Sequence, residues 1–97
     1  MKRATSKKKT KRKKMTFSID LSGAAEVFLM GDFNRWDPKK HPMKRNGNGE
    51  WSKSVILRPG DYEYKFLADG KWEEDPKNSR TCINAFGTLN NVFSVRL

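Results

Sequence analysis

The sequence predicts an all-β domain, a sandwich or a barrel, that follows a disordered basic tail. Short runs rich in β-branched and aromatic residues alternate with clusters of Gly, Pro, Asn and Asp at the spacing typical of these folds. The chain shows neither helical periodicity nor an internal repeat. Its 97 residues allow one small domain, which excludes the catalytic frameworks that need about 200 residues or more.

Residues 1–14 form the predicted tail. Nine of them are Lys or Arg, whereas every acidic residue lies from Asp20 onward. The whole chain has a net charge of +10, but residues 15–97 carry twelve basic against eleven acidic side chains and are the predicted folded domain. A run of like charges without hydrophobic residues is typical of disorder. The tail is either a solubilising extension or a nonspecific tether for polyanions such as nucleic acid.

The domain begins with two predicted strands. Phe17, Ile19 and Leu21 alternate with polar residues, which indicates a half-buried strand that the following Ser-Gly pair ends. Residues 26–30 form a nearly continuous apolar run. A run of this length predicts a strand that is covered on both faces.

A hairpin is predicted around residues 46–49. Their sequence, Asn-Gly-Asn-Gly, is a turn signal between the Met43 region and the β-rich run 51–57. Trp51 opens that run and is expected to be buried or packed at an edge. The Arg-Pro-Gly-Asp sequence at residues 58–61 then turns the chain again.

The clearest alternation in the chain spans residues 62–68. Tyr, Tyr, Phe and Ala occupy every second position, so Lys65 between them should point away from the core side. The Asp-Gly pair at residues 69–70 is a strong hairpin signal, and it predicts that residues 71–73 pair back on this strand.

The remainder is less regular. We expect irregular chain over residues 77–91 and a last strand over 92–97. Three consecutive acidic residues, Glu73, Glu74 and Asp75, precede this part. A glycosidase needs two carboxyl groups that face each other across a cleft, so we interpret these three as a solvated acidic edge.

Residue types required for catalysis or for metal binding are scarce. His41 and Cys82 are the single His and the single Cys, whereas a hydrolytic triad or a zinc site needs several such side chains. We expect His41 in a loop and Cys82 in a loop or half buried, without an internal disulfide partner. The sequence therefore predicts no enzyme, no metal and no cofactor. It also lacks an apolar run of membrane-spanning length and a hydrophobic signal segment, so we expect a cytoplasmic monomer.

Two Trp residues suggest a ligand site. Trp36 lies in a polar loop that ends at Pro38, and Trp72 follows the Asp-Gly turn. A Trp ring exposed on a rigid strand or loop suits a sugar, because the C–H face of a pyranose stacks on the ring while Lys and Asn side chains bind the hydroxyls. Nucleobases stack on the same rings. Burial of either ring in the core also stays open at this point.

Four sequence blocks occur in a specific order: VFLMGDFNRW at 27–36, GDYEYKF at 60–66, DGKW at 69–72 followed by Asp-Pro, and GTLNNV at 87–92. Together they resemble the glycogen-binding domain of the β subunit of AMP-activated protein kinase. More broadly, they resemble carbohydrate-binding module family 48, which includes the N-terminal early-set domains of isoamylases and branching enzymes. The resemblance implies an immunoglobulin-like (early-set) antiparallel β-sandwich. It also implies a non-catalytic module that binds α-1,4-glucan, such as glycogen, starch or a maltooligosaccharide.

The resemblance also implies a set of glucan-binding side chains. Two are stacking platforms, two donate hydrogen bonds to glucose, one lies beside these donors, and one is an aromatic residue that stacks on sugar or folds inward. In that order they are Trp36 and Trp72, Lys65 and Asn90, Thr88, and Phe86. Two alternatives stay open: a protein-interaction module that docks on a separately encoded glycan enzyme or kinase, and polyanion binding through the tail.

Overall fold

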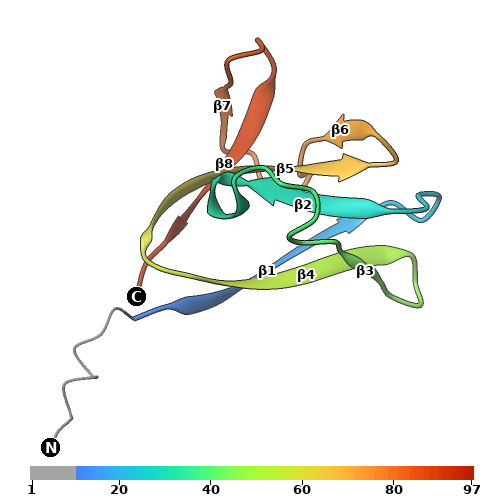
Figure 1. Cartoon of the computed structure of the whole chain (residues 1–97), viewed down its shortest axis with the longest axis horizontal. Coiled ribbons are helices and arrows are strands. Elements are labelled where there is room, and N and C mark those ends of the chain that lie inside the picture. Colours follow the sequence, from blue (N-terminus) through green and yellow to red (C-terminus); the bar gives the residue numbers. More distant parts are fainter. Residues whose placement is uncertain (1–10) are drawn as a thin grey trace, which may run out of the picture.

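A computed structural model describes residues 11–97, which form eight strands in two antiparallel sheets packed face to face (Figure 1). One sheet has the order β1-β4-β3. The other has the order β2-β5-β8-β7, with β6 paired to β5. This arrangement confirms the predicted β-sandwich. Residues 1–10, most of the predicted tail, lie outside the described residues. None of the helices in residues 11–97 has the length and apolar character needed to cross a membrane.

The smaller sheet consists of β1 (Lys13–Asp20), β4 (Glu50–Leu57) and β3 (Lys44–Arg45). The pairing of β3 with β4 confirms the predicted hairpin. β1 begins at Lys13, two residues before the expected start of the domain, because Lys13 pairs with Leu57 at the far end of β4. Strands pair through backbone N–H and C=O groups, and Lys has both groups, like every other residue except Pro. A Lys can therefore extend a strand.

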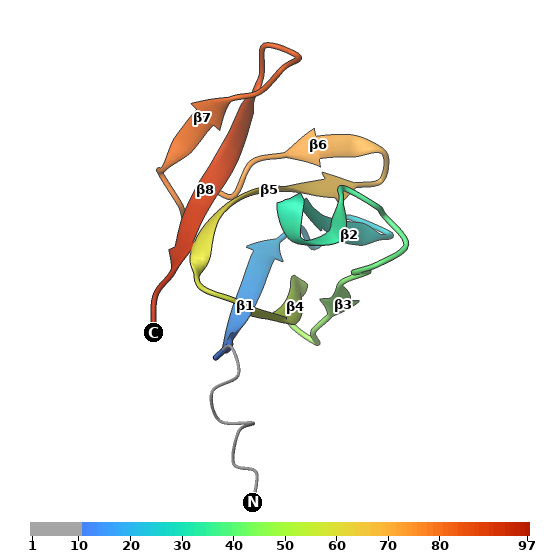
Figure 2. The same ribbon diagram turned by 60° about the vertical axis from the view of Figure 1, so that its left-hand side comes forward.

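The larger sheet is organised around β5 (Gly60–Ala68). One edge of β5 pairs with β2 (Val27–Gly31), as expected for an apolar strand. The other edge pairs first with β8 (Leu89–Val95) and then with β6 (Lys71–Glu73), which confirms the second hairpin. β7 (Thr81–Ile83) extends the sheet beyond β8. As Figure 2 shows, the β7–β8 hairpin and the β5–β6 hairpin point in different directions. They separate where β5 changes its partner from β8 to β6.

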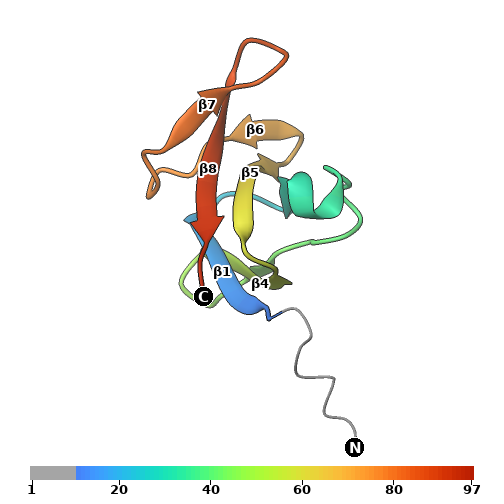
Figure 3. The same cartoon turned by 90° about the vertical axis from the view of Figure 1, so that its left-hand side faces the viewer.

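The core between the sheets is largely aromatic. The ring of Phe17 in β1 lies 4.9 Å from that of Tyr64 in β5 and 5.1 Å from that of Phe93 in β8, measured between centroids. Trp51 is buried, as predicted, and its Nε1–H donates to the carbonyl oxygen of Leu21 at 2.9 Å. Figure 3 shows the two layers from the side, with β1 and β4 in one and β5 and β8 in the other.

The predicted irregular stretch over residues 77–91 is wrong at two places. Thr81–Ile83 form β7, which pairs with the start of β8, and β8 begins at Leu89 instead of residue 92. The loop of this hairpin is short and polar, and Asn84 accepts the backbone N–H of Phe86 at 2.9 Å and that of Thr88 at 3.1 Å. A side chain that closes a turn in this way gives no periodic signal in the sequence.

The predicted solvated acidic edge is also wrong for Asp75. Its carboxylate is buried and accepts a hydrogen bond from the Tyr64 hydroxyl at 2.7 Å, while its backbone N–H donates to the Asn91 side chain at 2.7 Å. Burial and this carboxylate raise the pKa of Tyr64 above its ordinary value. Asp75 therefore anchors the crossing from β6 to β7.

Candidate functional site

An open groove of about 540 Å³ lies on the outer face of the larger sheet, between the β5–β6 and β7–β8 hairpins. All six residues proposed from the sequence line it: Trp36, Lys65, Trp72, Phe86, Thr88 and Asn90. The remaining lining residues are Asp32, Glu63, Ile83, Asn84 and Ala85. Four separate chain segments therefore contribute to one concave surface.

The alternation of β5 places two side chains on the floor of the groove. Tyr64 and Phe66 are buried between the sheets, so Glu63 and Lys65 project from the opposite face. Asn90 of β8 lies on this same outer face, because its neighbour Asn91 pairs with Tyr64 and shares the inner face. The sequence therefore predicted the direction of Lys65 correctly.

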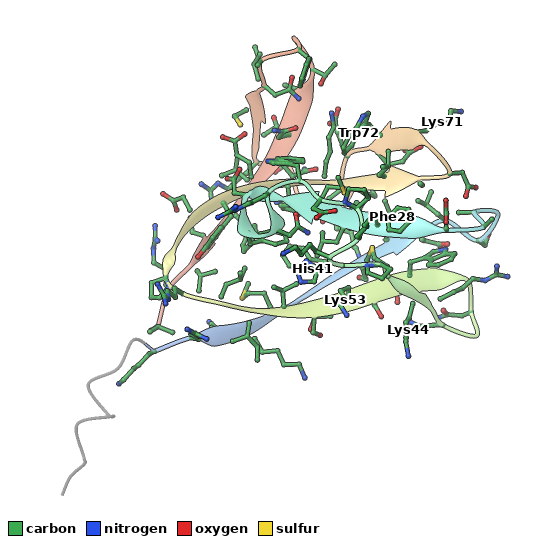
Figure 4. All side chains as sticks on the ribbon, viewed as in Figure 1. Phe28, His41, Lys44, Lys53, Lys71 and Trp72 are labelled. Atoms are coloured by element: carbon green, nitrogen blue, oxygen red, sulfur yellow. The ribbon has the colours of Figure 1, made fainter. Side chains whose placement is uncertain are left out.

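Trp72 forms one wall. It lies opposite Leu67 in the β5–β6 pairing, and 51% of its surface is exposed. In Figure 4 the ring stands on the side of the sheet that carries the β7–β8 hairpin, whereas the neighbouring Lys71 points away. The rings of Trp72 and Trp36 meet edge to face, with centroids 6.2 Å apart. Both rings therefore lie outside the core and on one side of the molecule.

Trp36 reaches the groove from a tight loop after β2. The loop contains one 3₁₀ turn, η2 (Asp32–Asn34), and then two residues with left-handed backbone, Arg35 at φ 57° and Trp36 at φ 58°. Left-handed backbone costs about 1–2 kcal/mol for a residue other than Gly. Hydrogen bonds offset this cost, because the Trp36 backbone N–H donates to Gly31 at 3.0 Å and its indole N–H donates to Asp32 at 3.3 Å.

Gly31 is needed at the start of this loop because of close contact. A Cβ atom there would lie 2.6 Å from the ring of Phe33 and 2.8 Å from the carbonyl oxygen of Glu63. The ring of Phe33 in turn lies 5.8 Å from Phe17 of the core, measured between centroids. The loop that carries Trp36 is therefore packed onto both sheets.

Lys65 is the cation of the groove, although only 6% of its surface is exposed. Among the described residues, its ammonium group donates one side-chain hydrogen bond, to Oγ1 of Thr88 at 3.2 Å. An ammonium group has three N–H donors. Two donors are thus available for a ligand that enters the groove.

Asn84 organises the opposite wall. Its Nδ2 donates to Oγ1 of Thr88 at 2.8 Å and to Oδ1 of Asn90 at 3.0 Å. These bonds connect the tip of the β7–β8 hairpin to the floor of the groove. Phe86 projects from this tip with 90% of its surface exposed, so its ring does not fold inward.

Two carboxylates line the groove, and both hold protein N–H groups. Asp32 accepts the backbone N–H of Glu63 at 2.8 Å as well as the Trp36 indole. Glu63 accepts Nδ2 of Asn90 at 3.0 Å. Partial burial, and next the Glu63 carboxylate, raise the pKa of the Cys82 thiol above its ordinary value, so the thiol stays protonated at neutral pH.

Sequence reasoning missed Asp32, Glu63 and Asn84. Glu63 was detectable, because it lies two residues from Lys65 in the same alternating strand and therefore shares its face. Asp32 and Asn84 lie in loops, where no periodicity indicates a direction. In the part of the chain from residue 11 onward, no group of three or more His, Cys, Asp or Glu side chains is arranged to hold a metal ion.

Comparison with known proteins gives one family match and several relatives. Residues 14–97 match the family described as the glycogen recognition site of AMP-activated protein kinase. The chain is 38% identical over 74 residues to 5'-AMP-activated protein kinase subunit beta-1 of Sus scrofa. It is 39% identical over 74 residues to Protein PTST homolog 2, chloroplastic, of Arabidopsis thaliana. It is also 39% identical over 72 residues to Protein FLOURY ENDOSPERM 6, chloroplastic, of Oryza sativa subsp. japonica.

These matches cover most of this chain but only part of each relative. The aligned region is 76% of this chain and 57% of the Sus scrofa protein. For the Arabidopsis thaliana protein the shares are 76% and 13%, and for the Oryza sativa protein they are 74% and 13%. Two of these relatives are named as chloroplastic proteins, so a cytoplasmic location of this chain stays a prediction.

Proposed function

The chain belongs to the family described as the glycogen recognition site of AMP-activated protein kinase, and on that premise we propose that its groove holds the glucose units of an α-1,4-glucan. The observation that carries this proposal is the convergence of two tryptophan rings, one ammonium group and one amide on a single open groove outside the core. Glycogen, starch and maltooligosaccharides share the α-1,4-linked glucose chain that would occupy it.

The two Trp rings would be stacking platforms. The C–H face of a glucose unit is apolar, whereas its edge carries hydroxyl groups, so a ring that is half in water suits the face. Trp36 and Trp72 meet edge to face, so their faces point in different directions and suit successive units of a curved chain. The exposed ring of Phe86 across the groove would add a third apolar contact.

The polar side chains would bind the hydroxyl edges. Lys65 has two N–H donors to offer, and its position beneath the groove restrains the long side chain before a ligand arrives. Asn90 and Thr88 are held by Asn84, so their orientation is also set in the free protein. Preorganised groups lose less conformational entropy on binding.

The module is proposed to be non-catalytic. Glycoside hydrolysis needs one carboxyl group as a proton donor and a second that attacks or activates water. The two carboxylates of the groove, Asp32 and Glu63, instead accept hydrogen bonds from the protein. An open groove with few contacts should bind with a dissociation constant of about micromolar to millimolar.

A titration with maltoheptaose, followed by NMR at the three indole N–H signals, tests this function. Trp36 and Trp72 should shift on binding. Trp51 provides the internal control, since its indole N–H is donated to Leu21 inside the protein and should not shift. Absence of any shift at Trp36 and Trp72 would contradict the proposal. Capture of a stoichiometric protein partner without glucan binding would favour a protein-interaction module instead.

A further inference from the structure

The loop that carries Trp36 is closed by a buried amide and the only His of the chain. We propose that Asn34 is the positioning residue of the Trp36 platform, and that it performs this role only while Nδ1 of His41 carries no proton. Glucan binding would then weaken in mildly acidic conditions. This last consequence rests on the proposed function, whereas the hydrogen-bond arrangement does not.

Asn34 links both ends of the loop. Only 4% of its surface is exposed. Its Oδ1 accepts the backbone N–H of Gly31 at 3.1 Å and that of Trp36 at 3.0 Å. Trp36 and the preceding Arg35 both adopt left-handed backbone, a conformation that persists in non-Gly residues only where neighbouring groups impose it. The Asn34 amide is one such group, because it binds Trp36 directly.

The contacts of the other amide atom determine the state of His41. The atom that receives two backbone N–H groups must be oxygen, so the second atom is nitrogen. This Nδ2 donates one hydrogen to the carbonyl oxygen of Leu29 at 2.8 Å. Its second hydrogen points to Nδ1 of His41, also at 2.8 Å. Nδ1 must therefore accept, and the neutral ring must carry its proton on Nε2.

Protonation of His41 would turn this contact into a conflict between donors. An imidazolium ring carries hydrogen on both nitrogens, so Nδ1–H would face the Nδ2 hydrogens of Asn34. The Asn34 amide cannot rotate to compensate, because its oxygen is required by Gly31 and Trp36 and its nitrogen by Leu29. A proton on His41 would therefore affect the position of Trp36 through Asn34, whose side chain binds both residues.

The surroundings of His41 also disfavour the charged ring. His41 lies alongside β2, where its carbonyl oxygen accepts the backbone N–H of Leu29 at 3.0 Å, and Lys53 of β4 lies on the side of the other sheet (Figure 4). Lys40 precedes it in the same loop, and the ring of Phe33 lies 5.9 Å away, measured between centroids. Partial burial first, and then the charges of Lys53 and Lys40, lower the pKa of His41 below its ordinary value of 6.5.

Because the closed loop lowers the pKa of His41, the stability of the closed loop depends on pH. Below pH 6.5 the open loop, in which His41 has its ordinary pKa, binds more protons than the closed loop. The closed loop is therefore fully favoured above about pH 7 and loses stability as the pH falls through 6.5 toward the lowered pKa. We expect glucan affinity to fall about 3- to 10-fold between pH 7.5 and pH 5.0, which is the effect of one lost hydrogen bond.

The test uses the full chain labelled with ¹⁵N, in which His41 gives the single histidine signal. Long-range ¹H–¹⁵N spectra at pH 7.5 should show an unprotonated Nδ1 and a protonated Nε2. On acidification, the backbone amide of Trp36 should shift with the same midpoint as the His41 ring. A proton on Nδ1 at pH 7.5, or a Trp36 amide that ignores the His41 titration, overturns the proposal.

Two variants separate this role from a general effect of acid. His41→Gln keeps a hydrogen-bond acceptor but does not titrate, so the Trp36 amide and the maltoheptaose affinity should lose their pH dependence below pH 6.5. Lys53→Gln removes a cation, so the common midpoint should move to higher pH. A pH dependence that survives His41→Gln refutes the proposal. Absence of glucan binding at every pH, with the Trp36 amide still following His41, refutes the proposed function and supports the positioning role.

Discussion

Replacement of Trp72 by Ala tests the glucan site most directly. The exposed part of this residue is 51% of its surface. A Trp side chain has about 200 Å² of accessible surface, so roughly 100 Å² of it is free to contact a ligand. A sugar that covers between half and all of this exposed area removes about 50–100 Å² of it from water. At about 25 cal/mol per Å², the lost contact is about 1.3–2.5 kcal/mol. Affinity for maltoheptaose should therefore fall about 8- to 70-fold.

The assay is isothermal titration calorimetry with maltoheptaose, or retardation in a native gel that contains glycogen. Lys71→Ala is the matched control, since Lys71 precedes Trp72 on the same short strand and points away from the groove (Figure 4). It should bind as the original chain does. Trp72 lies outside the buried core, so its replacement should leave the indole signal of Trp51 in place. An affinity within about 2-fold of the original, in a folded Trp72→Ala protein, refutes the reasoning.

Three further predictions concern stability and salt. Tyr64→Phe removes the hydroxyl that binds the buried Asp75 carboxylate, so unfolding free energy should fall by about 2–4 kcal/mol, and the Tm by about 8 °C or more in a thermal scan. A Tm change under about 3 °C would contradict the role given to Asp75. Gly31→Ala would place a Cβ against the Phe33 ring, so it should destabilise by about 1–3 kcal/mol in urea unfolding. Gly23→Ala is the control, because a Cβ at residue 23 would have no atom within 4 Å. Equal unfolding free energies of the two variants would rule out the close contact at Gly31. Maltoheptaose affinity should change less than about 2-fold between 50 and 500 mM NaCl, because a neutral sugar releases no counterions. A steep loss with salt in the same titration would instead favour polyanion binding through the tail.

The sequence predicted most strands because alternation and turn residues are local properties. The period-two pattern of residues 62–68 identified β5 and gave the correct direction of Lys65, and the Asp-Gly pair identified the β5–β6 hairpin. The exposure of Trp36 and Trp72 was open from sequence, because a Trp in a polar loop is compatible with a core position or a surface one. Only the packed sheets show that both rings lie outside the core.

The errors occurred where contacts distant in sequence override local pattern. Asp75 looks solvated beside two other acidic residues, yet the hydroxyl of Tyr64 makes its burial favourable. β7 is three residues long and exists because the edge of β8 supplies its hydrogen bonds. Neither partner can be identified from the residues next to Asp75 or Thr81.

The amino-acid order by itself determined most of the strands, the face of β5 on which Lys65 lies, and the family to which the chain belongs. These depend on alternation, turn propensity and ordered motifs, all of which are properties of neighbouring residues. Tertiary structure alone decided that four distant segments share one groove, and that Asn34 and His41 meet beneath the Trp36 loop. A groove and a buried hydrogen bond depend on the relative placement of two sheets, which only the folded chain establishes.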